Sequence, residues 1–245
     1  MSPHRFALKA KPMEFVLPRL PRQIPAFRIS SRVLRATLAM VCALLALLSP
    51  KLAFAHPHEW IEMKVEILFN DKGKAVAMRH DWTMDEFFSA YAVSDIDAKN
   101  GKPTEKALDE LMKEMLTNIS EIGFFIKASH SGASVPLLRF EPVSLTMPGR
   151  NLRMQFVLPF LGALDLSQAP LAYKVYDPEY YIEMLHIEGP KPIILAGAPK
   201  GCRWDLVPPS DNQSMAAYAS SLGIDEAPTI ELGAFFAEEA SIKCQ

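Results

Sequence analysis

Apolar and polar side chains alternate along residues 60–69, with apolar residues at every odd position and charged residues at three of the even ones. This two-residue period is typical of a β-strand that buries one face. The sequence DKGK at 71–74 predicts a tight turn, and residues 75–82 are again extended in character. We therefore expect a hairpin over 60–82. Its predicted register pairs Ile67 with Met78, Phe69 with Val76, and Val65 with His80 on the core side.

Two helices are predicted after this hairpin. The sequence TMDE at 83–86 matches a capping box, in which Thr83 and Glu86 satisfy each other's backbone N–H groups, so a helix should begin there. A second helix is expected over 104–118, with apolar residues on one side and acidic residues on the other. The apolar face of the first helix is predicted to consist of Phe87, Phe88, Tyr91 and Ala92.

The rest of the chain reads as strands separated by turns, with one short helix at 211–221. A hairpin, then a helix pair, then many strands is typical of an α+β protein. We expect one domain with an antiparallel β-sheet or sandwich and a helical-pair insertion after the first hairpin. The expected later strands are 123–129, 137–145, 151–159, 171–176, 180–187 and 192–196.

The N-terminal region has the layout of a secretory signal peptide. A basic segment leads into 13 uncharged residues at 36–48, followed by the sequence AFA at 53–55. A basic region, an apolar region of this length and an A-x-A site are the three parts of such a signal, and a membrane span needs roughly 20 apolar residues. We expect cleavage after Ala55 and a single periplasmic domain over 56–245. An uncleaved N-terminal anchor is the alternative.

Charge is divided unevenly along the chain. Residues 1–55 hold nine Lys or Arg and one acid, which leaves 17 of the 26 bases and 27 of the 28 acids in residues 56–245, a formal charge of −10 with His neutral. Such a surface repels phosphates and lacks a basic footprint, which argues against nucleic acid as a partner. It suits a protein that handles cations.

The predicted mature chain contains two cysteines, Cys202 and Cys244. In an oxidising compartment a disulfide between them is the default expectation. Two unpaired thiols, or soft metal ligands, are the alternatives, although the spacing is unlike the C-x-x-C of zinc and redox sites.

Cleavage after Ala55 would create the N-terminus His56-Pro57-His58. The terminal amine and the imidazole of His56 can chelate one metal ion, and His58 adds a second imidazole. Pro57 lacks the amide hydrogen that a square-planar site through deprotonated amides would need. The remaining donor set suits Cu, Zn, Ni or Co rather than Ca or Mg. Alternatively, both histidines are merely solvated terminal residues.

Other possible ligands have structural explanations of equal weight. Strand parity places His80 on the face opposite His58, where a core histidine bonded to Asp81 or to a backbone carbonyl is as plausible as a ligand. Asp85 opens a predicted helix, and Asp177 lies in a turn between strands. We expect His130 to be solvated in a turn and His186 to be packed on a strand. The sequence has no phosphate loop, nucleophile elbow or H-E-x-x-H helix.

Several segments together resemble a bacterial family of unknown function, generally labelled as the periplasmic component of an uncharacterised ABC-type transport system. They are HPHEWI at 56–61, RHDWTMDEF at 79–87, VYDPEYY at 175–181, and the cysteines 202 and 244. Members of that family occur beside, or fused to, permeases that resemble nickel/cobalt exporters. The resemblance implies metal binding at His56 and His58, with His80, Asp85 and Asp177 as the next candidate ligands.

Three functions are compatible with these features. The leading hypothesis is a non-enzymatic, periplasmic accessory protein that binds a divalent transition metal, Zn, Ni, Co or Cu, for an inner-membrane metal permease. The first alternative is a copper-dependent oxidase or oxygenase with an N-terminal histidine brace, for which His80 is the nearest candidate second imidazole. The second alternative is a non-catalytic partner-binding module whose histidines are incidental.

Overall fold

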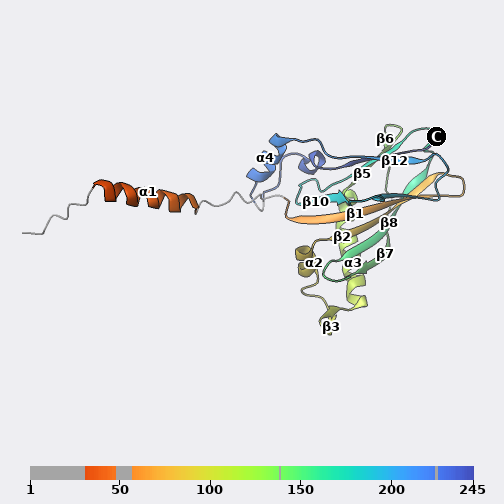
Figure 1. The fold of residues 1–245 in the computed structure, drawn as a ribbon. Helices are drawn as coiled ribbons and strands as arrows, with labels where there is room; N and C mark the ends of the chain where they lie inside the picture. Colours follow the sequence, from red (N-terminus) through yellow and green to blue (C-terminus); the bar gives the residue numbers. More distant parts are fainter. Residues whose placement is uncertain (1–30, 48–56, 138, 224–225) are drawn as a thin grey trace, which may run out of the picture. The chain divides into compact units, whose positions relative to one another are not determined.

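The computed structural model describes residues 31–47, 57–137, 139–223 and 226–245 (Figure 1). Its contacts divide the chain into two units, 1–51 and 52–245. In the first unit, α1 (Ser31–Leu47) covers most of the apolar segment of the predicted signal. Among the described residues, no helix combines the length and the apolar character needed to cross a membrane. The predicted cleavage site at Ala55 lies outside the described residues.

The predicted hairpin forms in the second unit from β1 (Glu59–Phe69) and β2 (Ala75–Met84). The register agrees with the prediction at two pairs: Ile67 faces Met78, and Val65 faces His80. At the turn, however, Phe69 pairs with Ala75 instead of Val76, across a bulge.

The turn explains this shift. The Asn70 side-chain oxygen accepts hydrogen bonds from the N–H groups of Lys72 and Lys74, both at 3.0 Å, and the Asn70 N–H donates to the Lys74 carbonyl. The loop that these hydrogen bonds close therefore contains more residues than the two-residue turn predicted from the sequence. The extra length is absorbed as the bulge.

The first sheet has the strand order β10-β1-β2-β8-β7, with β11 also paired to β1. On one side, β2 pairs with β8 (Arg153–Leu164), which pairs with β7 (Glu141–Thr146). On the other, β10 (Ile182–His186) and β11 (Ile193–Ala196) follow each other along β1, and both run parallel to it. The sheet is therefore mixed, although most of its pairings are antiparallel as expected.

The second sheet has the order β12-β13-β9-β5-β6 and is antiparallel throughout. Buried side chains from both sheets belong to one core, which confirms the α+β, sandwich-like prediction. Val65 and Phe156 represent the first sheet in it, and Tyr173 and Ile242 the second. The strands are β5 (Ile126–His130), β6 (Ala133–Ser134), β9 (Leu171–Val175), β12 (Arg203–Val207) and β13 (Glu239–Lys243).

The expected helical pair is inserted between the hairpin and β5. It consists of α2 (Glu86–Ala92) and α3 (Glu105–Glu121), with the short hairpin of β3 (Ala98–Lys99) and β4 (Lys102–Pro103) between them. The helix α3 lies against β7 (Figure 1). It buries an apolar stripe of Leu108, Met112 and Leu116. Near the C-terminus, α4 (Gln213–Ser221) and the 3-10 turn η2 (Leu232–Phe235) pack with Tyr180 in a smaller apolar cluster.

The predicted cap at Thr83 is wrong, because Thr83 is still part of β2. The strand is held between two neighbours, with Thr83 opposite Glu62 on one side and Arg153 on the other. The N-cap is Asp85, whose Oδ1 accepts hydrogen bonds from the N–H groups of Phe87 and Phe88 at 2.7 and 2.9 Å. Strand pairing therefore overrides the local capping signal.

The predicted apolar face of the first helix is also partly wrong. Phe88 and Ala92 pack against the core, whereas Phe87 and Tyr91 are 87% and 79% exposed. Phe87 and Tyr91 are four residues apart and therefore share one face of α2, which is the exposed one, whereas Phe88 and Ala92 share the buried one.

Several strand boundaries also differ from the prediction. The segment expected as a strand at 123–129 begins with the 3-10 turn η1 (Gly123–Phe125). Of the strand expected at 137–145, only the part in β7 is a regular strand. The strands β12 and β13 were not predicted.

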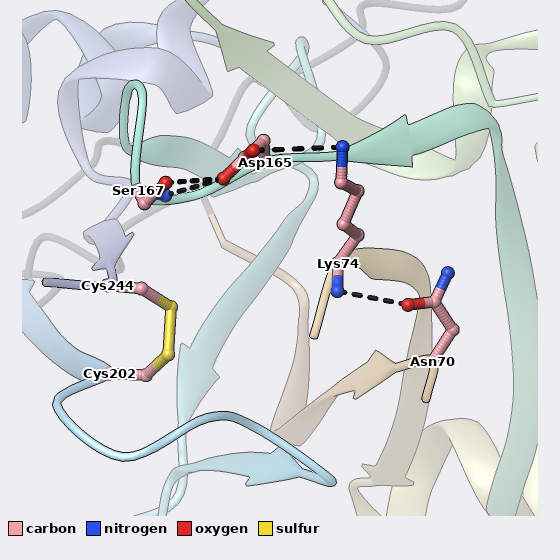
Figure 2. The surroundings of a disulfide bond; sticks show 6 residues. All are labelled: Asn70, Lys74, Asp165, Ser167, Cys202 and Cys244. Atoms are coloured by element: carbon pink, nitrogen blue, oxygen red, sulfur yellow. Dashed lines mark hydrogen bonds and ion pairs between the residues drawn. A yellow bond between two sulfur atoms is a disulfide. The ribbon is translucent and has the colours of Figure 1, made fainter. Parts of the chain in front are cut away.

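The structure joins Cys202 and Cys244 in a disulfide (Figure 2). The two residues flank the paired ends of β12 and β13, where Arg203 faces Lys243. The N–H of Cys244 also donates to the Leu166 carbonyl at 3.0 Å. The bond therefore closes the edge of the second sheet, beside the ion pair of Lys74 and Asp165 that Figure 2 also shows.

Candidate functional site

His58 is fixed at the entrance to β1. Its backbone N–H donates to the Tyr181 carbonyl at 2.8 Å, and its ring lies 4.6 Å from the Tyr181 ring, centroid to centroid. The residue is half-buried, so it is not the fully solvated terminal residue of the alternative interpretation. Its neighbour His56, the other half of the predicted chelate, lies outside the described residues.

Asp85 ties the start of α2 to the start of β1. In addition to its two capping bonds, its Oδ2 accepts a hydrogen bond from the Trp60 N–H at 3.0 Å, and its own N–H donates to the Trp60 carbonyl. A carboxylate has about four acceptor positions, and Asp85 uses three of them on backbone groups. Its main role in the described structure is to hold the chain on either side of it in place.

Asp177 plays the same part on the other side of β1. Its Oδ1 accepts a hydrogen bond from the Glu179 N–H, and its Oδ2 accepts from the N–H groups of Tyr181 and Ile182 at 2.8 and 3.1 Å. These bonds shape the turn that leads into β10, the strand that pairs with the start of β1. Asp177 therefore positions the Tyr181 carbonyl, which in turn holds His58.

Gly233 allows a close approach of η2 to this turn. A Cβ atom at this position would lie 2.0 Å from the Asp177 carbonyl oxygen, so only glycine fits without moving the backbone. Tyr180, in the same turn, adopts a φ of 59°. The position of the turn is thus set both by its own hydrogen bonds and by the segment packed on it.

Glu59 is a third carboxylate at this end of β1, and it was not among the predicted ligands. Burial, followed by the negative charges of Asp85 and Asp177, raises the pKa of Glu59 from 4.5 to about 7. No Lys or Arg in the described part of the chain forms an ion pair with any of the three carboxylates. Strand parity could have revealed Glu59, because it places the residue on the inner face with Ile61.

His80 is not brought to this site. It is fully buried opposite Val65, its ring stacks on Phe156 at 5.2 Å, and its Nδ1 accepts a hydrogen bond from the Trp82 Nε1–H at 3.3 Å. Burial, and then the proximity of His186, lowers the pKa of His80 to about 3. It is a neutral core histidine, and its partner is Trp82, where Asp81 or a backbone carbonyl was expected.

His186 links the two sheets. Its backbone and its Nδ1 both donate to the Glu238 carboxylate, at 2.7 and 2.8 Å, so its Nε2 is left to accept the Tyr173 hydroxyl at 3.0 Å. Tyr173 comes from β9 of the second sheet and His186 from β10 of the first. The histidine is therefore packed, as predicted.

The predicted ligands fall into two groups. His58, Asp85 and Asp177 meet at the start of β1, together with Glu59, while His80 lies in the core. Among the described residues, no three His, Cys, Asp or Glu side chains are arranged to hold a metal ion by themselves.

Two comparisons place the chain among known sequences. The family model described as "Protein of unknown function (DUF1007)" matches residues 41–244. An uncharacterised protein of Haemophilus influenzae is 26% identical over 195 residues, which is 78% of this chain and 92% of the relative. Neither match bears the name of an enzyme. The family match covers far more than half of the sequence, and the chain belongs to the DUF1007 family.

Proposed function

We propose that the mature protein begins at His56 and binds a divalent transition metal through the His56-Pro57-His58 terminus, as a periplasmic accessory to an inner-membrane metal permease. The metal is cargo in this proposal, and Zn, Ni, Co and Cu all fit the nitrogen donors. The proposed ligands are the terminal amine and imidazole of His56 and the imidazole of His58.

The observation that carries the proposal is the position of His58. The residue is held by Tyr181, which Asp177 positions, and it directly precedes Glu59, whose pKa is raised by burial and by the charges of Asp85 and Asp177. Anionic groups gathered at one end of a strand attract cations and raise their local concentration. A metal ion bound at the terminus would also relieve the repulsion that Glu59 experiences.

The carboxylates support the site by different means. Asp85 and Asp177 each accept three hydrogen bonds from backbone N–H groups. They therefore support the site by their charge and by positioning the backbone. Burial and the two neighbouring charges, and no hydrogen bond, shift the pKa of Glu59, which makes it the carboxylate best suited to approach the metal directly. This adds one oxygen donor to a nitrogen-rich set.

The copper oxidase alternative is less well supported. A histidine brace needs a second imidazole opposite the first, and His80, the nearest candidate by sequence, is enclosed in the core beside Phe156. His58 would have to supply that imidazole itself. The permease association rests on the family resemblance.

Metal titration of the processed protein tests the proposal. The N-terminus is first confirmed as His56 by intact mass, and Zn²⁺, Ni²⁺, Co²⁺ and Cu²⁺ are then titrated separately by calorimetry. Tight binding of one equivalent without peroxide-dependent turnover of the copper form supports the accessory role. Turnover would favour the oxidase, and no binding of any of the four ions would contradict the proposal. Acidification through about pH 6 should release the metal as the imidazoles are protonated.

A further inference from the structure

The second sheet ends in the edge strand β12, whose outer side is open. β12 pairs with β13 along all five of its residues, and no other strand in the described parts of the chain pairs with it. The disulfide of Cys202 and Cys244 ties one end of this edge to β13 and holds it in place (Figure 2). An open edge presents a row of unpaired N–H and C=O groups to which another strand can be added.

Two other sheet edges are shielded in ways that β12 is not. Proteins protect an edge with a very short strand, a proline or a bulge. At the far edge of the second sheet β6 has only two residues, and at an edge of the first sheet β7 contains Pro142 and a register shift. β12 has five residues in regular pairing and contains neither a proline nor a bulge. It therefore lacks the usual protection against pairing with another strand.

The charges on β12 select what can pair there. Strand parity points Arg203 and Asp205 outward, and both are exposed, whereas Trp204 packs against the core. Neither Arg203 nor Asp205 forms an ion pair with a described residue. Arg203 lies opposite Lys243 of β13, and like charges in directly opposed positions are unfavourable. A negative group on the open side of Arg203 would offset this repulsion.

A second copy of the same strand supplies the complementary charges. If two β12 strands pair antiparallel about a twofold axis at Trp204, Arg203 of each copy faces Asp205 of the other. The Cβ atoms of directly opposed residues lie about 4.5–5.5 Å apart, which permits both ion pairs. An axis at Arg203 or at Asp205 would instead oppose two like charges. The charge pattern therefore favours one register, and a twofold pairing of two edges closes on itself.

The inner face of β12 fits the same arrangement. The two Trp204 side chains would meet across the axis as a cross-strand aromatic pair. A cavity of about 520 Å³, lined by residues of both β11 and β12, borders Trp204 and leaves room for the second ring. Ile193 and Leu195 of β11 supply apolar walls. Apolar contacts would thus accompany the two ion pairs.

We propose that the protein forms a symmetric dimer through β12, held by backbone hydrogen bonds, two Arg203–Asp205 ion pairs and the packing of Trp204 across the axis. The second sheet then continues from one copy into the other. One short strand pairing buries less than the roughly 1,200 Å² of a standard interface, so the dimer is weak, with a dissociation constant on the order of 10 µM. The dimer needs no metal ion and does not depend on the proposed metal-binding function.

Charge reversal tests this dimer. Sedimentation velocity follows the mature protein from about 1 to about 200 µM, a range that brackets the expected constant, with EDTA present so that no metal ion can bridge two copies. Arg203→Glu makes both outward charges negative and Asp205→Lys makes both positive. Each variant should therefore repel its own copy and dimerise at least about tenfold more weakly. An equimolar mixture of the two variants should recover the dimer, because every negative position then faces a positive one.

Asp109 and Lys113 provide the matched control. Both are exposed on α3, and neither forms an ion pair with a described residue. Asp109→Lys and Lys113→Glu reverse the same charges as the two β12 variants. They should leave the dimer unchanged, alone or mixed. Amide exchange in β12 should also slow as the wild-type dimer forms, because its outward N–H groups become paired.

A wild-type protein that stays monomeric across this concentration range would overturn the inference. So would a dimer that survives both reversals on β12, because its contact would lie elsewhere, or a mixture of the two variants that fails to associate. Assemblies that keep growing with concentration would contradict a closed pair of edges. None of these results bears on metal binding, because EDTA is present throughout.

Discussion

The Asp85 carboxylate and the Trp60 backbone are joined in both directions: Oδ2 accepts from the Trp60 N–H at 3.0 Å, and the Asp85 N–H donates to the Trp60 carbonyl at 3.0 Å. The same carboxylate caps α2. One side chain thus fixes both the helix start and the segment that carries the proposed metal ligands.

Asp85→Ala should lower the free energy of unfolding by about 1–2 kcal/mol, because a helix cap and a strand contact are lost together. Asp85→Asn should retain most of the stability, since asparagine also caps helices. Urea denaturation measures both. Thr83→Val is the control, because Thr83 lies in β2 and the β-branched replacement suits a strand. A cost for Thr83→Val equal to that of Asp85→Ala would restore the capping box predicted from the sequence.

Burial of neutral His80 should make the protein sensitive to acid. The pKa of His80 is about 3 in the folded state, against the ordinary value of 6.5 for a histidine, so only the unfolded chain takes up this proton between these values. Stability from this group is full above pH 6.5 and is lost as the pH falls toward 3, by about 2 kcal/mol between pH 8 and pH 5. His80→Gln keeps an acceptor for the Trp82 N–H and should flatten this dependence.

Urea denaturation of both proteins at pH 8 and pH 5 checks the prediction about His80. The difference at pH 8 gives the intrinsic cost of the substitution, because His80 is neutral in both states there. If the two proteins lose the same stability between pH 8 and pH 5, His80 is not the buried neutral group described above.

Gly233→Ala should destabilise the protein by at least about 2 kcal/mol, because the added Cβ would meet the Asp177 carbonyl oxygen at 2.0 Å. The turn before β10 would have to move, and with it the Tyr181 carbonyl that holds His58. Metal affinity should therefore fall as well, in calorimetry under conditions where the variant remains folded. Gly223→Ala is the matched control, since its Cβ would meet nothing closer than 3.7 Å. Equal behaviour of the two variants would count against the packing described for η2.

If the chain is exported as proposed, the mature protein should begin at His56 and contain the disulfide of Cys202 and Cys244, which are 42 residues apart. Intact mass with and without reductant tests both points. Replacing both cysteines with serine should cost about 4 kcal/mol, on the chain-entropy model for a loop of this length. A mature species that retains residues 52–55, or one with two free thiols after unfolding without reductant, would contradict the prediction.

Local patterns predicted the elements that depend on neighbouring residues. Alternation along β1 predicted the hairpin and correctly placed His80 on the side that faces the core. The apolar stripe of α3 predicted which face of that helix is buried. Non-local pairing was beyond such patterns, as the parallel alignment of β10 and β11 along β1 shows. The capping error arose because TMDE is a valid local signal, which pairing of Thr83 with β1 and β8 overrides.

The candidate site was predicted only in part, for a related reason. His58, Asp85 and Asp177 come from separate parts of the sequence, and the fold places all three at the start of β1. Glu59 was not predicted because its raised pKa depends on burial and on two acidic neighbours, Asp85 and Asp177. Those neighbours come from distant parts of the sequence. Parity placed His80 on the core side of the hairpin, and its position opposite buried Val65 agrees.

The most direct test of the metal-binding proposal changes the terminus and keeps every imidazole. Calorimetry compares the processed protein with a form that carries one extra Gly before His56, for whichever of the four ions binds best. The extension converts the His56 amine into an amide, so affinity should fall at least about tenfold. His58→Ala should also weaken binding, and His130→Ala should leave it unchanged. Equal affinities of the processed and extended forms would contradict a terminal chelate and leave only a site built from side chains.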